Sequence, residues 1–138
     1  MIELADSSAW GKRHALDVRE REAFANALRT AQIATCDHVV GELLFSARGH
    51  ADLVATRRDL TALPYCPIGP VQYQRAFEVM AALAKVGRHR QANFNDCLIA
   101  AAAEIAGVGL LHYDADYEAI ASVTGQPTRA IAPIGSLR

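Results

Sequence analysis

The sequence predicts an α/β protein, a three-layer sandwich in which helices cover both faces of a short, mainly parallel central sheet. Short apolar segments alternate along the chain with longer segments of helical periodicity, which is typical of parallel strands joined by right-handed crossovers. The strand segments are short and apolar, as expected of a sheet covered on both faces. With 138 residues and no internal repeat, residues 1–138 are expected to form one domain.

The first half of the chain is expected to hold two strands and three long helices. A short apolar run at 2–5 predicts the first strand. Residues 19–31 carry alanine, phenylalanine and leucine at helical spacing, which predicts an amphipathic helix. The apolar run at 33–36 predicts the second strand. Helical spacing of apolar residues then predicts helices over 37–48 and 51–63, which end at a glycine and a proline.

The second half continues this alternation. Residues 65–68 predict a further short strand, although three prolines surround it. A long amphipathic helix is expected over 71–86, and a polar, basic loop over 88–95. The strongly apolar segment 96–106 predicts a buried helix, and the apolar run 109–113 predicts a buried strand. The chain is expected to close with a helix and a strand, at 114–123 and 128–131.

Composition and charge exclude several classes of protein. The chain has 14 Lys+Arg and 15 Asp+Glu residues and a formal net charge of -1, so no overall basic excess attracts nucleic acid. The three cysteines, Cys36, Cys66 and Cys97, form no CxxC pair and indicate reduced thiols rather than disulfides or a zinc site. The sequence has no signal-peptide pattern and no apolar run long enough to span a bilayer. We therefore expect a cytoplasmic protein without a membrane partner.

Acidic residues follow two of the expected strands at their carboxyl ends. Asp6 ends the first strand, and Asp114 and Asp116 follow the strand at 109–113. The carboxyl ends of parallel strands meet at one edge of a sheet, which is where ligands bind in open α/β folds. These carboxylates are therefore expected to lie close together.

Two more acids lie on apolar faces of expected helices. Asp96 shares a helical face with Ile99 and Ala103, and Glu42 shares one with Val39. A buried carboxylate without a partner is costly, so several of them at one sheet edge require a cation. Hard divalent cations prefer oxygen ligands, so the pattern predicts a site for Mg²⁺, with Mn²⁺ as an alternative.

Several of these acids also have a purely structural interpretation as helix caps. Asp6 is placed to cap a short helix that begins at the following serines. Asp96 is placed to cap its own helix, although Asn93 and Asn95 compete for that role. Asp37 is interpreted as a cap rather than a ligand.

The other acids have different structural alternatives. Asp114 and Asp116 together are consistent with an ordinary turn that leads into a helix, whose dipole favours negative charge at its start. Glu42 is alternatively expected to pair with Arg48 or Arg13 at the surface. Only the joint pattern of the acids favours a metal site.

Four sequence blocks stand out along the chain, and they read DSSA at 6–9, VVGEL at 39–43, NDCLIAAAA at 95–103 and LLHYDADY at 110–117. Together, in order and spacing and over essentially the whole chain, they resemble the PIN-domain ribonucleases, the VapC-type toxins of type II toxin–antitoxin systems. Two residues depart from the family pattern. His112 stands where the family often has threonine, so it is expected to orient a carboxylate, contact substrate or simply pack. Tyr117 stands where the family often has phenylalanine, and is expected to disturb little.

The resemblance implies a PIN-like fold and Mg²⁺-dependent endonucleolytic cleavage of transfer, ribosomal or messenger RNA. It implies catalytic roles for Asp6, Glu42, Asp96 and Asp114, with Asp6 and Asp96 as the most direct metal ligands. Asp116 is expected to be either a ligand of a second metal or an acceptor behind the first ligands. The family also implies a homodimer and a cognate VapB-type antitoxin.

Basic residues beside the expected site are candidates for contact with RNA phosphates. Arg88 and Arg90 precede Asp96, and Lys12 and Arg13 follow the first block. Ser7 is expected to steady the neighbouring Asp6 or to touch a phosphate. Two other functions remain open, namely a flap-type DNA nuclease and a catalytically silent PIN domain that binds only metal and a partner.

Overall fold

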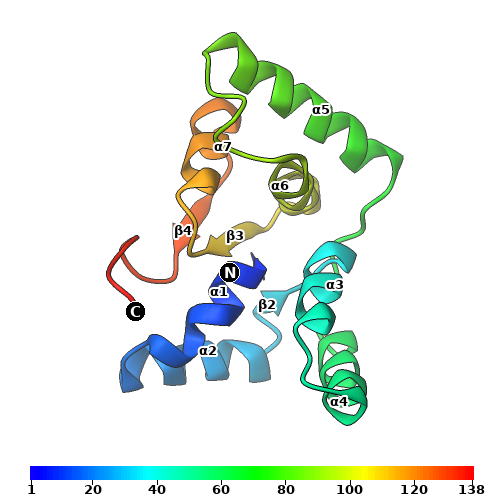
Figure 1. Cartoon of the computed structure of the whole chain (residues 1–138), viewed down its shortest axis with the longest axis vertical. Helices are drawn as coiled ribbons and strands as arrows, with labels where there is room; N and C mark the ends of the chain where they lie inside the picture. Colours follow the sequence, from blue (N-terminus) through cyan, green and yellow to red (C-terminus); the bar gives the residue numbers. More distant parts are fainter.

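The computed structural model describes residues 1–138, which form a four-stranded parallel sheet and seven α-helices (Figure 1). The strands lie in the order β2-β1-β3-β4, and every neighbouring pair is parallel. Their bounds are Glu3–Ala5 for β1, Ile33–Ala34 for β2, Gly109–His112 for β3 and Thr128–Ala130 for β4. The parallel sheet and four of the expected strands are thereby confirmed.

The helices occupy the expected segments with small shifts at their ends. Their bounds are Ser7–Lys12 for α1, Val18–Arg29 for α2, Asp37–Phe45 for α3, His50–Thr61 for α4, Pro70–Lys85 for α5, Phe94–Ala106 for α6 and Asp116–Thr124 for α7, with a 3-10 turn at Arg13–Ala15. Gly107 ends α6 in the left-handed conformation, at φ 73°, which a glycine adopts without strain.

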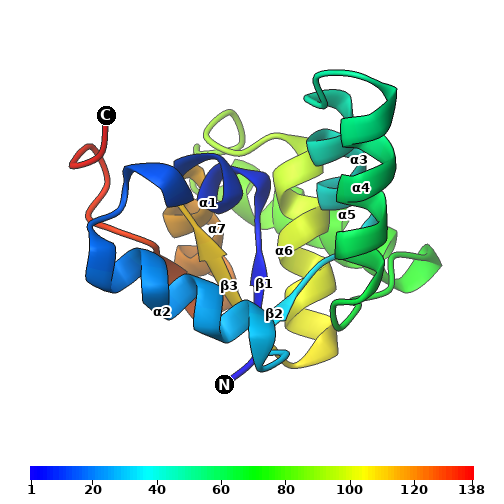
Figure 2. The same cartoon turned by 90° about the horizontal axis from the view of Figure 1, so that it is seen from below.

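The elements form the expected sandwich. The helices α1 and α2 lie on one side of the sheet, and α6 and α7 lie on the other (Figures 1 and 2). The long helix α5 packs on the outer side of α6 and α7, and the α3–α4 hairpin lies beyond β2 (Figure 1). None of the helices is long and apolar enough to cross a membrane.

The helix α6 is the centre of the hydrophobic core. Its residues from Cys97 to Ala103 are all buried, so it is covered on every side for two turns. A helix that is apolar all round is stable only inside a protein. Its alanines let the sheet and α5 approach closely, while Leu110 of β3 and Ile120 of α7 fill the space around it.

The strand expected at 65–68 does not form. Only one isolated bridge, between Thr35 and Tyr65, links this segment to the sheet. Pro64 and Pro67 flank the bridge, and proline has no N–H to donate to a ladder, so the pairing stops after one residue.

Two helix starts differ from the expectation. Asp37 does not cap α3, because Cys36 holds the capping position and Asp37 is the first helical residue. Asp96 does not cap α6 either, because the helix begins earlier and the side chain of Asn93 accepts the Asp96 N–H at 2.8 Å. The Asp96 carboxylate is therefore free of the capping role.

Candidate active site

The carboxyl edge of the sheet brings together acids from three elements. The carboxyl ends of β1 and β3 and the start of α6 lie at the same end of the molecule (Figure 2). Pairing between the strands extends to Asp6, whose N–H donates to the Leu111 carbonyl at 2.9 Å. Asp96 lies in the first turn of α6, and Asp116 in the first turn of α7.

Three carboxylates form the tightest group at this edge. Asp96, Asp114 and Asp116 each offer one oxygen, and these oxygens lie within 4.8 Å of one another. The Asp116 N–H donates to Oδ1 of Asp114 at 2.9 Å, which holds the turn between β3 and α7. Three converging carboxylate oxygens are a donor set that fits a hard divalent cation.

The electrostatics of Asp96 reflect this crowding. Burial, and after it the charges of Asp6, Asp114 and Asp116, together raise the pKa of its carboxyl to about 7. A hydrogen bond from Tyr117 acts in the opposite direction. No lysine or arginine forms an ion pair with these acids or with Glu42. The cluster therefore lacks a compensating positive charge from the chain itself.

Asp6 combines two of the roles considered for it. Its Oδ2 accepts hydrogen bonds from the N–H of Ser8 at 3.1 Å and from the Ser8 hydroxyl at 2.7 Å, so it caps α1. It also lies close enough to Asp96 to raise the pKa of that carboxyl. The Ser8 hydroxyl accepts the Tyr113 N–H at 2.9 Å and so ties the ends of β1 and β3 together.

Glu42 lies at the rim of the acidic cluster. Its two oxygens accept hydrogen bonds from the Ser7 hydroxyl at 3.1 Å and from the Asn95 amide at 3.3 Å. It forms no ion pair with Arg48 or Arg13, because Arg48 pairs with Asp52 instead. The α3 face around Glu42 borders an open cavity of about 590 Å³.

Comparisons with known proteins agree with this arrangement. Residues 4–123 match the PIN domain family. The chain belongs to the PIN-domain family. It is 40% identical to Ribonuclease VapC18 of Mycobacterium tuberculosis, over 99% of this chain and 100% of that protein. It is 35% identical to Ribonuclease VapC21 of the same organism, over 96% of each. Its fold is similar to a chain in the crystal structure of DNA-bound VapBC from Salmonella typhimurium, with a TM-score of 0.74 and 16% identity, over 96% of this chain and 100% of that one.

The PIN domain contains one residue at the site whose role the sequence did not reveal. Tyr117 is fully buried, and its hydroxyl donates to Oδ1 of Asp96 in a long hydrogen bond of 3.4 Å. That tyrosine at this position disturbs little stays a prediction, but its hydroxyl, which phenylalanine lacks, lies among the carboxylates. The sequence signal for this contact was that Tyr117 stands where the family often has phenylalanine.

His112 of the PIN domain is a packed residue that also orients a carboxylate-bearing turn. It is 1% exposed, and burial lowers its pKa. Its Nδ1 accepts the Asp114 N–H at 3.1 Å. Its ring lies 5.3 Å from the Tyr117 ring, between centroids.

The basic residues expected to contact RNA lie in different places on the PIN domain. Arg88 is held by Gln91 and by Ser122 of α7, at 2.9 and 3.1 Å. Arg90 is exposed, and the Lys12 ammonium lies 5.9 Å from the centre of the Tyr113 ring. Arg13 instead stacks over Trp10 at 5.3 Å and faces a groove whose lining includes none of the five acids.

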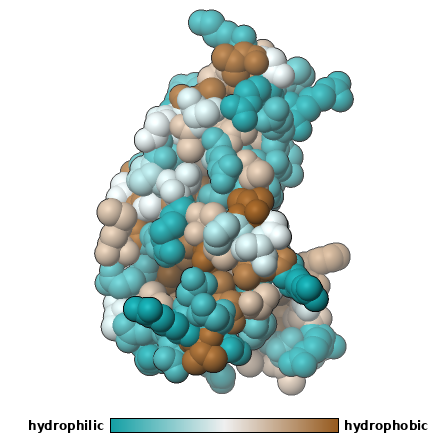
Figure 3. Space-filling view, turned by 90° about the vertical axis from the view of Figure 1, so that its left-hand side faces the viewer, coloured by the Kyte–Doolittle hydropathy of each residue, from teal (hydrophilic) through white to brown (hydrophobic).

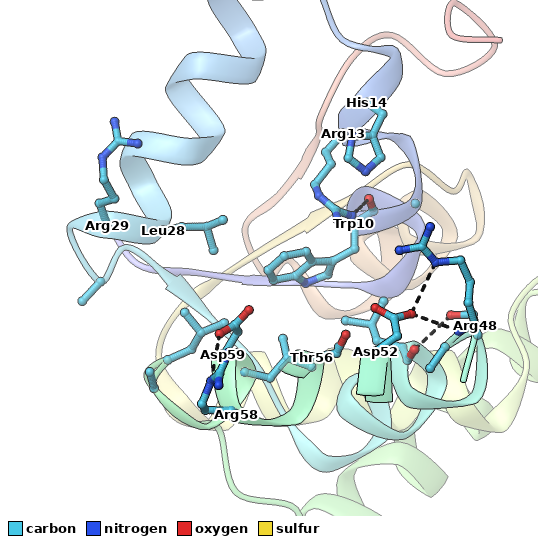
Figure 4. Close-up of a pocket in the computed structure, with 18 residues that line it drawn as sticks. Trp10, Arg13, His14, Leu28, Arg29, Arg48, Asp52, Thr56, Arg58 and Asp59 are labelled. Atoms are coloured by element: carbon cyan, nitrogen blue, oxygen red, sulfur yellow. Dashed lines mark hydrogen bonds and ion pairs between the residues drawn. The ribbon is translucent and has the colours of Figure 1, made fainter. Parts of the chain in front are cut away.

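This groove is the largest cavity of the PIN domain, at about 1040 Å³. It runs between α1 and α2 on one side and the α3–α4 hairpin on the other, and Trp10 projects into it (Figure 4). The Nε1 atom of Trp10 is buried and has no hydrogen-bond partner. The charged residues that line the groove are four arginines and two aspartates, namely Arg13, Arg29, Arg48, Arg58, Asp52 and Asp59. The walls of the groove are therefore positively charged overall.

Proposed function

We propose that this PIN domain is a Mg²⁺-dependent endoribonuclease that acts as the toxin of a type II toxin–antitoxin pair. The acidic cluster at the carboxyl edge of the sheet carries the proposal, because three carboxylates converge there without a cation from the chain. The names of its full-length relatives, which are ribonucleases, support the same activity. Transfer, ribosomal and messenger RNA are the proposed substrate classes.

The chain's carboxylates provide the chemistry of this proposal. Asp96, Asp114 and Asp116 would hold the cation, with Asp6 beside them and Glu42 at the rim. A bound Mg²⁺ lowers the pKa of a coordinated water and stabilises negative charge on a phosphate, and both effects favour phosphodiester hydrolysis. Ser7 and Asn95 orient Glu42, and Ser8 orients Asp6. We retain all five acids as site residues.

The proposed RNA path follows three of the basic residues that the sequence predicts to contact RNA. Lys12, Arg88 and Arg90 would contact phosphates, and Ser7 lies at the rim with its hydroxyl on Glu42. Such contacts position the backbone without reading its sequence. Arg13 fits the groove better than the RNA path, because its guanidinium is stacked on Trp10.

We propose that the groove around Trp10 receives the cognate antitoxin. A partner there would cover the apolar wall and offer an acceptor to the buried Trp10 N–H, whose lack of a hydrogen bond is otherwise costly. The excess of arginines favours an acidic, amphipathic segment. Arg29→Glu, at a cation without an ion pair, should weaken the complex at least about 10-fold without changing the free nuclease. Unchanged affinity would exclude the groove.

We also propose a homodimer, as in the family. The rings of Tyr73 and Phe77 on α5 stack on Phe94 of α6, with centroids 6.0 and 5.7 Å apart, and all three are partly exposed. By contrast, the face of the molecule on the side of α7 and the C-terminus mixes small hydrophobic patches with hydrophilic side chains (Figure 3). Phe77→Asp should convert a dimer to a monomer in light scattering, and an unchanged dimer would exclude this surface.

The cytoplasm is the proposed location. All three cysteines are buried and free, which suits a reducing compartment.

The decisive experiment is cleavage of total cellular RNA by the purified protein. Discrete fragments should appear with Mg²⁺ and vanish with EDTA or in Asp96→Asn. Glu22→Gln, which removes an exposed acid on α2, is the matched control and should cleave normally. Cleavage of single-stranded or flap DNA instead of RNA would indicate the flap-type alternative. A folded protein that binds Mg²⁺ but cuts neither would indicate the silent PIN domain.

A further inference from the structure

The turn between β3 and α7 carries two of the three clustered carboxylates, and a side chain of β3 holds it. The Asp114 N–H donates to Nδ1 of His112 at 3.1 Å, so this nitrogen carries no proton and the neutral ring has its hydrogen on Nε2. Asp114 in turn accepts the Asp116 N–H. Through these two hydrogen bonds, the position of the His112 ring affects the positions of both carboxylates of the turn.

The third clustered carboxylate is held by the residue that packs against His112. Tyr117 donates its hydroxyl to Asp96 at 3.4 Å, and its backbone N–H donates to the Asp114 carbonyl at 3.2 Å. It is fully buried and belongs to the first turns of α7. The hydroxyl therefore reaches across from α7 to α6, and links the turn to a carboxylate on a different element.

The two rings leave each other little freedom. Their centroids lie 5.3 Å apart at an interplanar angle of 43°, and neither residue is more than 1% exposed. Protein interiors are closely packed, so a change of one ring displaces the other. Both are positions at which this sequence departs from the residues that the family often has.

From these contacts we infer that His112 and Tyr117 act as one positioning pair, which sets Asp114 and Asp96 at the mutual distance that a divalent cation requires. This inference rests on the proposed metal-dependent function. Neither residue needs to touch the cation or the substrate. Partners of this kind behind metal ligands typically change metal affinity about 10- to 100-fold when they are removed.

The test measures Mn²⁺ affinity by calorimetry at pH 8.5, where the Asp96 carboxyl is ionised. His112→Leu removes the acceptor and should weaken binding about 10-fold, whereas His112→Asn, which keeps an acceptor near the Nδ1 position, should stay within about 3-fold of wild type. Tyr117→Phe removes only the hydroxyl and should weaken binding about 3- to 10-fold. The double variant His112→Leu/Tyr117→Phe should lose less than the product of the two single effects, because the residues act as a unit.

A control separates positioning from loss of stability. Leu111→Val alters the other face of β3, toward α2, and should lower the melting temperature without changing Mn²⁺ affinity. If His112→Leu fails to fold in EDTA, Tyr117→Phe still tests the pair, because it keeps the ring. Wild-type affinity in Tyr117→Phe and in any folded His112→Leu, fully multiplicative losses, or no Mn²⁺ binding by the wild type would each overturn the inference. Weakened Mn²⁺ binding in a protein whose wild type cleaves no RNA would leave the pair standing and refute the nuclease.

Discussion

The acidic residues at the two ends of β1 lie in opposite electrostatic environments. At its start, Glu3 forms a two-pronged ion pair with Arg129 of β4, with N–O distances of 3.0 and 2.7 Å. Just past its end, Asp6 accepts two hydrogen bonds from Ser8 and lies among other carboxylates. The same strand therefore carries one neutralised acid and one that is not neutralised.

The helix α6 repeats this contrast. Glu104, near its end, forms a two-pronged ion pair with Arg75 of α5, at 2.6 and 3.2 Å. Asp96, in its first turn, has no cationic partner and a raised pKa. Acids that join elements are paired with arginine, whereas acids at the sheet edge are left for an external cation. Sites of this kind sacrifice stability for function.

The largest effect should come from exchanging the acids at the two ends of α6. Asp96→Asn should reduce RNA cleavage at least about 100-fold, because it removes a ligand and a charge where phosphate charge must be stabilised. Glu104→Gln, at the paired end of the same helix, should cleave at nearly the wild-type rate. Initial rates at saturating Mg²⁺ measure both, and equal losses would contradict the contrast.

The free energy of unfolding should depend more on the acid at the end of α6 than on the acid at its start. Glu104→Gln leaves Arg75 with only Glu78, and breaking this partly buried pair should cost about 1 kcal/mol of the free energy of unfolding, measured in urea. Glu78→Gln removes the more exposed partner of the same arginine and should cost about half as much or less. A larger loss for Glu78→Gln would show that the two-pronged pair is not the stabilising one.

The metal-free protein should lose stability as pH rises. The Asp96 carboxyl has a folded pKa of about 7, above its unfolded value, so the folded state binds more protons between about pH 4 and 7. In EDTA the melting temperature should therefore fall over that range, by about 3 °C after allowance for partial exposure. Asp96→Asn should flatten this slope and melt higher at pH 8. His112, whose lowered pKa acts in the opposite direction, is present in both proteins, so a difference in melting temperature between wild type and Asp96→Asn that stays constant from pH 4 to 7 would contradict the raised pKa of Asp96.

The smallest effect concerns the cations outside the cluster. Arg88→Gln and Arg90→Gln should each lower the slope of log affinity for RNA against log salt by about one, because each removes one phosphate contact. Their Mn²⁺ affinity should not change, since neither arginine pairs with the acids. Binding titrations at several salt concentrations, with catalytically inactive Asp96→Asn as background, measure this. An unchanged slope removes both residues from the RNA path.

Local pattern was sufficient for most of the fold. Apolar periodicity located every long helix and four of the strands to within a few residues, and acids directly after β1 and β3 had to share one edge once the strands were parallel. The expected strand at 65–68 failed because one bridge between Thr35 and Tyr65 is all that the flanking prolines permit. The cap of α6 was ambiguous, because asparagine and aspartate at neighbouring positions have similar capping preference.

The sequence by itself determined the fold class, the reduced cysteines and which acids lie at the ends of strands, because these depend on periodicity and chain order. Only the tertiary structure decided that Asn93 caps α6, that Arg13 faces the groove, and that the Tyr117 hydroxyl reaches Asp96. Each of these depends on where a side chain ends in space, often on another element. Such contacts are set by packing between helices that local preference does not encode.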